Sequence, residues 1–211
     1  MALAIAAAAA GGLVIGWGLN GVAARFDAVR WTSGAAAVAA LTAALFAAVT
    51  AVHHDDATRL VLGLVLVAFA IPLSLIDLEL RLLPNRLTAP AALVAIVLGT
   101  ALDPGGEPER LVAGVAAGGF FLVAALVNPA GMGMGDVKLA AVLGLLLGRE
   151  VVVALFAALL AAVLVGVVIM ARKGVAAGRK TGVPFGPFMG LGGCLAVLFG
   201  EALLDAYGAS P

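Results

Sequence analysis

The apolar residues of this chain come in long blocks separated by short polar stretches. A helix needs roughly 20 apolar residues to cross the roughly 30 Å hydrocarbon core of a membrane. We expect seven blocks to form membrane helices, over residues 2–24, 34–52, 59–77, 87–102, 110–128, 150–171 and 184–205. The pattern therefore predicts an all-α fold, that of a polytopic helical membrane protein.

An eighth block, residues 137–148, is apolar but short. At about 1.5 Å of rise per residue it reaches only part of the way across a membrane. Either it begins earlier, inside the glycine stretch before it, or it lies in a thin or protein-lined region. No stretch between the blocks is long enough for a soluble domain, so we expect one membrane domain over residues 1–211. The first dozen residues lack the basic region of a signal peptide, and we expect them to start the first helix.

Composition supports a membrane protein, because 64% of the 211 residues are hydrophobic and 11% are charged. Soluble domains are nearer half apolar and a quarter charged. Cys194 is the single cysteine, which excludes a disulfide framework and a cysteine-based metal site. The net charge is zero, and we expect the lipid bilayer, not nucleic acid, as the chain's surroundings.

Charge predicts the topology, because cytoplasmic loops collect Lys and Arg. With eight crossings and the N-terminus outside, the inside holds nine of the twelve basic residues and the outside eight of the twelve acids. If the block 137–148 did not cross, the basic stretch 171–180 would fall on the opposite side from the earlier basic loops. The charges therefore favour eight crossings and place Asp77 and Asp136 at the cytoplasmic face.

Asp77 and Asp136 are the acids that need an explanation. Asp77 ends the block 59–77, where it is either an interfacial polar residue or a functional charge bordering a span. Asp136 follows the sequence GMGMG, where it is either an ordinary helix N-cap or part of a site shaped by glycines of unusual backbone freedom. Two carboxylates held close together cannot easily both ionise, so one becomes an acid and the other a base. Such a pair can activate water for amide hydrolysis.

Other roles for these and neighbouring polar residues stay open. A non-catalytic transporter or assembly protein would use the two aspartates as proton-relay acids, but transporters usually place such acids near the midplane and contain inverted repeats. Lys138 either holds or tunes the carboxyl group of Asp136 or is one of the basic residues that keep this end of the helix on the inside. Glu79 points away from Asp77 on a helix and is expected to pair with Arg81 or solvent. The run from His53 to Asp56 has metal-ligand residue types, but adjacent residues cannot all face one ion.

Four motifs, in this order, resemble those of the prepilin peptidases, the type IV leader peptidases among the membrane aspartic proteases with a Gly-x-Gly-Asp motif. Residues 133–136, GMGD, match that motif, and IDLELRLLPNRLTAPAAL, residues 76–93, is similar to the family's first aspartate segment. VPFGPFMGLGG, residues 183–193, resembles the stretch of the final helix, and GLVIGWGLNGVAARF, residues 12–26, resembles the opening helix.

The resemblance implies a reaction: cleavage of the short basic leader of prepilins or pseudopilins, after a glycine, at the cytoplasmic face of a bacterial plasma membrane. It implies Asp77 and Asp136 as the catalytic acids, with no metal and no cofactor required for cleavage. It also implies a set of residues that bind substrate or shape the site, namely Gly133, Gly135, Lys138, Pro84, Pro184, Phe185, Gly186 and Pro187. For the last four, a pure packing role is the alternative.

The chain departs from the family at two places. Many bacterial members carry two Cys-x-x-Cys pairs, a zinc-binding pattern, in a loop after the first helix, and many of those also methylate the new N-terminus with S-adenosylmethionine. Here that loop is the cysteine-free FDAVRWTSG. The resemblance therefore implies a short form without zinc and puts N-methylation in doubt. Asn85 stands where the family often has Asp.

Overall fold

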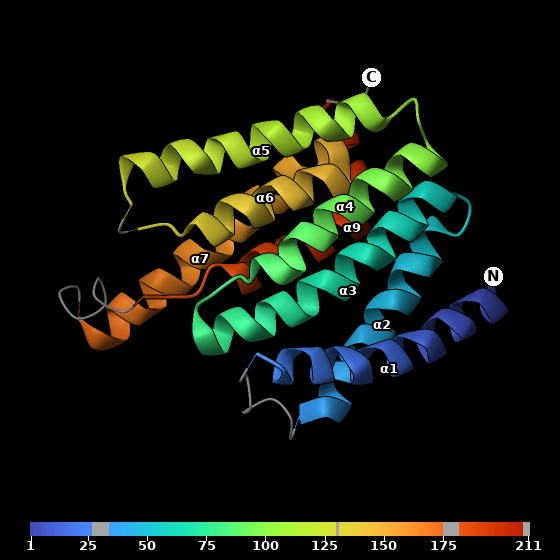
Figure 1. Cartoon of the computed structure of the whole chain (residues 1–211), viewed down its shortest axis with the longest axis horizontal. Coiled ribbons are helices and arrows are strands. Elements are labelled where there is room, and N and C mark those ends of the chain that lie inside the picture. Colours follow the sequence, from blue (N-terminus) through green and yellow to red (C-terminus); the bar gives the residue numbers. More distant parts are fainter. Residues whose placement is uncertain (27–33, 130, 175–181, 209–211) are drawn as a thin grey trace.

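The computed structural model describes residues 1–26, 34–129, 131–174 and 182–208. These residues form eight α-helices and one short 3₁₀ helix, and none of them lies in a β-strand (Figure 1). The all-α prediction is confirmed. The elements are α1 (Ala2–Ala24), α2 (Ala35–His53), α3 (Ala57–Leu80), α4 (Asn85–Leu102), α5 (Glu107–Val127), α6 (Met134–Leu147), η2 (Gly148–Glu150), α7 (Val151–Lys173) and α9 (Gly186–Ala206).

Two helix boundaries differ from the expected blocks in ways that affect the site. Helix α3 continues to Leu80, so Asp77 lies within its last turn and is not its final residue. Helix α6 begins at Met134, inside the glycine stretch, because the Asp136 side chain caps the first turn. The short apolar block 137–148 therefore begins earlier than its apolar residues do, which was the first of the two alternatives for it.

In the described part of the chain, seven helical segments are long and apolar enough to cross a membrane. The continuous run from Met134 to Lys173 counts as one of the seven, although it contains both α6 and α7. The architecture is that of a polytopic helical membrane protein. Helix α6 has only 14 residues, and eight crossings therefore remain a prediction.

The chain reverses direction between α6 and α7 at Gly148. This residue has φ of 59°, in the left-handed region that favours glycine. Figure 1 shows α6 running back along α5, after which α7 leads away from the reversal. The N-terminus of α6 therefore lies at one end of the bundle, and its C-terminus faces the other.

Small residues let the helices pack closely, as is common where lipid removes the hydrophobic drive for association. A Cβ on Gly12 of α1 would lie 2.7 Å from the Cα of Ala43 in α2. A Cβ on Gly144 of α6 would lie 2.5 Å from the carbonyl oxygen of Ala113 and 2.6 Å from the Cα of Gly114, both in α5. Helix α3 is central, in contact with α1, α2, α4, α6 and α9.

We expect Gly144→Ala to destabilise the protein, because the atoms that the new methyl group would meet are backbone and cannot rotate away. Overpacking of this kind costs about 1–3 kcal/mol. The thermal unfolding midpoint in detergent should fall. The matched control is Gly119→Ala on α5, where a Cβ would meet nothing within 4 Å. Equal midpoints for the two variants would contradict the close packing of α5 on α6.

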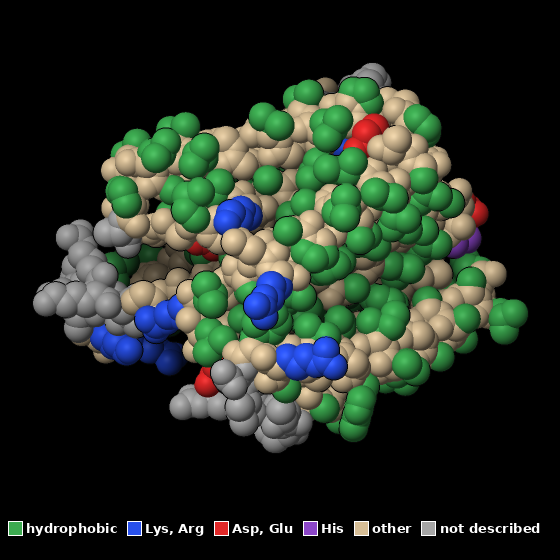
Figure 2. Space-filling view, viewed as in Figure 1, with side chains coloured by type: hydrophobic (Ala, Val, Ile, Leu, Met, Phe, Trp, Pro, Cys, Tyr) green, Lys and Arg blue, Asp and Glu red, His purple; other side chains and the backbone are tan. Residues whose placement is uncertain are grey.

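The two ends of the bundle differ in charge. Figure 2 shows most of the visible Lys and Arg side chains toward one end and the visible His side chain at the other. A cavity at the first end is lined by Asp77 and Asp136 together with Arg81, Arg86 and Lys138. A cavity at the opposite end is lined by four acids and three arginines, namely Asp56, Asp103, Glu109, Glu150, Arg59, Arg110 and Arg149. The assignment of the first end to the cytoplasm stays a prediction.

Candidate active site

Asp77 and Asp136 line the same cavity, which has a volume of about 620 Å³. The cavity lies between the end of α3, the turn into α4 and the start of α6. Its lining consists of Phe26, Asp77, Arg81, Leu82, Leu83, Pro84, Asn85, Arg86, Gly133, Met134, Gly135, Asp136 and Lys138. The fold thus brings together two acids that are far apart in the sequence.

Asp77 lies near the end of α3 and is only 5% exposed. Its Oδ2 accepts a hydrogen bond of 2.8 Å from the backbone N–H of Gly186, the first residue of α9. The N-terminus of a helix carries a partial positive charge and favours a carboxylate there. An ordinary interfacial carboxylate would be solvated, so the burial of Asp77 argues against that alternative.

Asp136 lies in the first turn of α6 and is half-buried. Its Oδ2 accepts a hydrogen bond of 3.2 Å from the backbone N–H of Gly133, which is the N-cap residue. Asp136 is therefore not the N-cap itself, as one alternative expected, but the acid at the third helical position, whose side chain accepts from the N-cap N–H as in one half of a capping box. This bond fixes the side chain at the edge of the cavity.

The glycines before Asp136 act by close approach more than by backbone freedom. None of Gly131, Gly133 and Gly135 has a positive φ. A Cβ on Gly135 would lie 2.8 Å from the Cβ of Leu83, in the turn between α3 and α4. A Cβ on Gly133 would make only an ordinary contact, 3.5 Å from Oδ2 of Asp136. Gly135 therefore lets α6 approach the turn that follows Asp77.

Lys138 connects α6 to α4. Its Nζ donates a hydrogen bond of 2.8 Å to Oδ1 of Asn85, the first residue of α4. Pro84, which precedes Asn85 and is the N-cap residue of α4, is buried and also lines the cavity. Sequence reasoning missed the pairing with Asn85, which it noted only as a departure from the family.

Arg81 is a second residue that sequence reasoning did not place in the site. It follows α3 with φ of 51°, a left-handed conformation that is uncommon outside glycine. Its backbone N–H donates a hydrogen bond of 2.9 Å to the carbonyl oxygen of Asp77, and its side chain lines the cavity. Pro84 signals that the helix must end nearby, but nothing in the sequence marks Arg81 for this conformation.

The stretch from Pro184 to Pro187 leads into α9, and its residues make different kinds of contact. Gly186 meets the carboxylate of Asp77, and a Cβ there would lie 2.8 Å from its Oδ2. Phe185 packs instead on other rings, with centroids 5.8 Å from Phe121 and 6.3 Å from Phe188. Pro184 and Pro187 flank them, and Pro187 lies in the first turn of the helix. The structure brings Gly186 to the candidate site and gives Phe185 a packing role.

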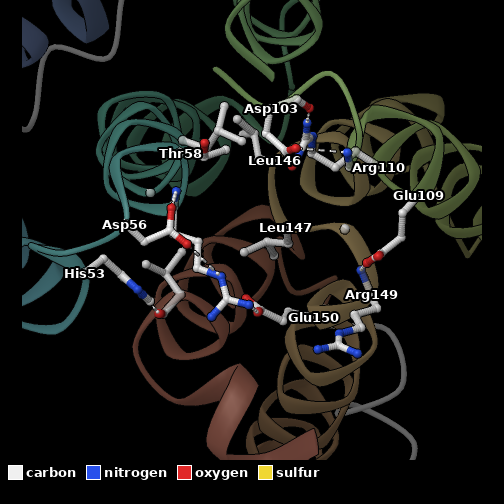
Figure 3. Close-up of a pocket in the computed structure, with 16 residues that line it drawn as sticks. His53, Asp56, Thr58, Asp103, Glu109, Arg110, Leu146, Leu147, Arg149 and Glu150 are labelled. Carbon is white, nitrogen blue, oxygen red and sulfur yellow. Dashed lines mark hydrogen bonds and ion pairs between the residues drawn. The ribbon is translucent and has the colours of Figure 1, made fainter. Parts of the chain in front are cut away.

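The cavity at the opposite end has a volume of about 350 Å³ and is crossed by ion pairs (Figure 3). Arg110 donates to Glu107 at 3.1 Å and to Asp103 at 3.0 Å. This guanidinium, with the backbone N–H of Gly106, holds the pKa of Asp103 below its ordinary value. At this end, Arg110 is therefore paired with both Glu107 and Asp103.

The residues from His53 to Asp56 are used in helix contacts and capping. Nε2 of His53 lies 2.6 Å from the carbonyl oxygen of Val197, which joins α2 to α9. Asp56 is the N-cap of α3 and accepts a hydrogen bond of 2.9 Å from the backbone N–H of Arg59. Within the described ranges, no group of three or more His, Cys, Asp or Glu side chains is placed to hold a metal ion. Residues 27–33 of the short loop FDAVRWTSG and residues 175–180 of the basic stretch 171–180 lie outside the described residues.

Comparison with known proteins gives one family throughout. The relatives that match include three bacterial proteins named prepilin leader peptidase/N-methyltransferase. The one from Bacillus subtilis is 32% identical, over 79% of this chain and 66% of the relative. The one from Xanthomonas campestris is 33% identical, over 69% of this chain and 52% of the relative. The one from Dichelobacter nodosus is 32% identical, over 81% of this chain and 59% of the relative. The chain thus spans a little over half to about two thirds of the length of these three relatives. No solved structure matches it significantly.

The type IV leader peptidase family matches residues 64–171. This segment contains both Asp77 and Asp136 and ends before α9. It covers just over half of the chain. The chain therefore belongs to the type IV leader peptidase family.

Proposed function

We propose that the chain is a membrane-embedded aspartic endopeptidase that removes the short basic leader from prepilin-like substrates. The observation that carries the proposal is the shared cavity of Asp77 and Asp136. The names of the relatives, prepilin leader peptidase/N-methyltransferase, supply the substrate class. Since the chain covers only part of those relatives, N-methylation is not included.

The two carboxyl groups divide the work of hydrolysis. One is protonated and the other is a carboxylate, because like charges held close together cannot easily both ionise. The carboxylate takes a proton from water as the water oxygen attacks the scissile carbonyl carbon. The protonated partner gives its proton to the leaving nitrogen as the C–N bond breaks. The two acids titrate as a pair, so neither role belongs to one residue alone.

The hydrogen bonds of the site hold both acids for this reaction. Gly186 and Gly133 each donate a backbone N–H to an Oδ2 atom, that of Asp77 and Asp136 respectively. Each carboxyl group is thereby fixed through one oxygen, and its Oδ1 can serve the water. Fixed, preorganised groups of this kind lower the cost of reaching the transition state.

The position of the acids also favours a peptidase over a proton-relay protein. Asp77 lies in the last turn of α3, and Asp136 lies in the first turn of α6. Both are therefore at helix ends, where substrate and water enter from one face of the membrane. We place that face in the cytoplasm of a bacterial plasma membrane, because the same end carries Arg81, Arg86 and Lys138.

A processing assay tests the proposal. The chain is co-expressed with a tagged prepilin in a bacterial host that lacks its own leader peptidase, and the mass of the pilin is measured. We expect loss of the leader, and no loss when the glycine before the cleavage site of the prepilin is replaced. An unprocessed prepilin beside a chain that has accumulated in the membrane would overturn the proposed function.

A further inference from the structure

A second, largely apolar cavity opens on the side of the bundle between α4 and α6, with a volume of about 400 Å³. On α4 it is lined by Asn85, Thr88, Ala89 and Ala92, and on α6 by Lys138, Ala141 and Val142. The lining residues on each helix recur at spacings of three and four, so each helix presents one stripe to the groove. We call this cavity the α4–α6 groove.

The α4–α6 groove adjoins the candidate active site. Asn85 and Lys138 line both cavities, and the hydrogen bond between them forms the boundary. On one side of this bond lie Asp77 and Asp136, and on the other lie the alanines of the groove. A ligand that occupies both spaces must therefore pass the Asn85–Lys138 pair.

The groove is suited to an apolar helix that approaches from the lipid. Ala89 is exposed on α4, and its neighbours Leu93 and Val97 are 63% and 55% exposed. Small residues such as the groove alanines let another helix approach closely within a membrane. From Asn85 to Ala92 the stripe rises by about 10 Å, or two helical turns.

We propose that the α4–α6 groove holds the first turns of the substrate's own hydrophobic helix, with the leader junction at the Asn85–Lys138 pair. This inference rests on the proposed function, because that function requires a substrate whose cleavage site adjoins an apolar helix. With the helix in the groove, the peptide bond just before it reaches the cavity of Asp77 and Asp136. The groove then determines which membrane segments can be cut.

Site-directed photocrosslinking tests the inference directly. A benzophenone amino acid is placed at Ala89 of the full chain, which is otherwise unaltered, and the chain is co-expressed with a prepilin and irradiated. The matched control position is Ala116, an exposed alanine on α5 away from the groove. We expect a product with the mass of chain plus pilin from Ala89 and not from Ala116.

Three crosslinking results would overturn the inference. The first is no pilin product from Ala89, and the second is equal products from both positions, which indicates chance encounters in the membrane. The third is a product of twice the mass of the chain from Ala89, which would assign the groove to a second copy.

Kinetics distinguish failure of the groove from failure of the proposed function. We expect Ala89→Trp to raise the KM for prepilin by roughly tenfold, the equivalent of about 1.4 kcal/mol of docking, with kcat retained. Ala116→Trp should change neither value. A loss of kcat in Ala89→Trp would indicate a distorted site and count against docking. If the unaltered chain cleaves prepilin but the Ala89 crosslink and the KM change are not found, only the proposal of docking in the groove is refuted. If the unaltered chain does not cleave prepilin, both proposals are refuted.

Discussion

Asp77→Asn and Asp136→Asn should each abolish leader removal. Asparagine matches the size of aspartate, and its side-chain oxygen can still accept the hydrogen bond that Gly186 or Gly133 donates. What it cannot do is exchange a proton with the water or the leaving nitrogen. General acid–base catalysis by one such group contributes about 10²–10⁴-fold, so processing should fall below detection in a cell.

The double variant tests whether the acids act as a pair. Residues that work as a unit are strongly non-additive, so the double variant should be no slower than either single one. The measurement is the fraction of co-expressed prepilin that loses its leader, with the amount of chain in the membrane determined in parallel. Asp55→Asn, at an exposed position at the opposite end of the bundle, is the control and should process normally. Retained cleavage by either active-site variant would refute the dyad.

The helical fold could be predicted because lipid leaves the backbone few alternatives. Within a membrane each N–H and C=O must be satisfied internally, so a long apolar block becomes a helix. The errors occurred where polar residues belong to helices. The apolar block 59–77 stopped at Asp77, but α3 continues to Leu80. The block 137–148 left out Asp136, which is inside α6 because its side chain caps the first turn.

The location of the two acids could be predicted, but not their partners. Charge counting placed Asp77 and Asp136 at one end of the bundle, and they share a cavity there. Gly186 is 109 residues from Asp77, and no local pattern shows which carboxylate its N–H will meet. The bond from Lys138 to Asn85 likewise depends on how α6 and α4 pack. Such contacts depend on tertiary packing, which short-range sequence patterns do not contain.

Gly186→Ala should impair cleavage severely although it removes no functional group. The alanine keeps the N–H that donates to Asp77, but its Cβ would lie 2.8 Å from Oδ2 and 3.1 Å from Cγ of that residue. To relieve this contact, the buried carboxyl group of Asp77 must move away from its present position. A displacement of about 1 Å at a reacting group can cost roughly 10²-fold in rate. The rate of leader removal by the purified variant in detergent measures the effect.

A double-mutant comparison separates this local effect from general damage to the fold. If the new methyl group acts only by moving the Asp77 carboxyl group, Gly186→Ala should lower the cleavage rate only in chains that still have that carboxyl group. Asp77→Asn has already lost that group, so adding Gly186→Ala should reduce any residual rate no further. Gly119→Ala, which adds a methyl group in open space, should cleave normally. A Gly186→Ala variant that cleaves at the unaltered rate would show that the contact between α9 and Asp77 does not position the acid.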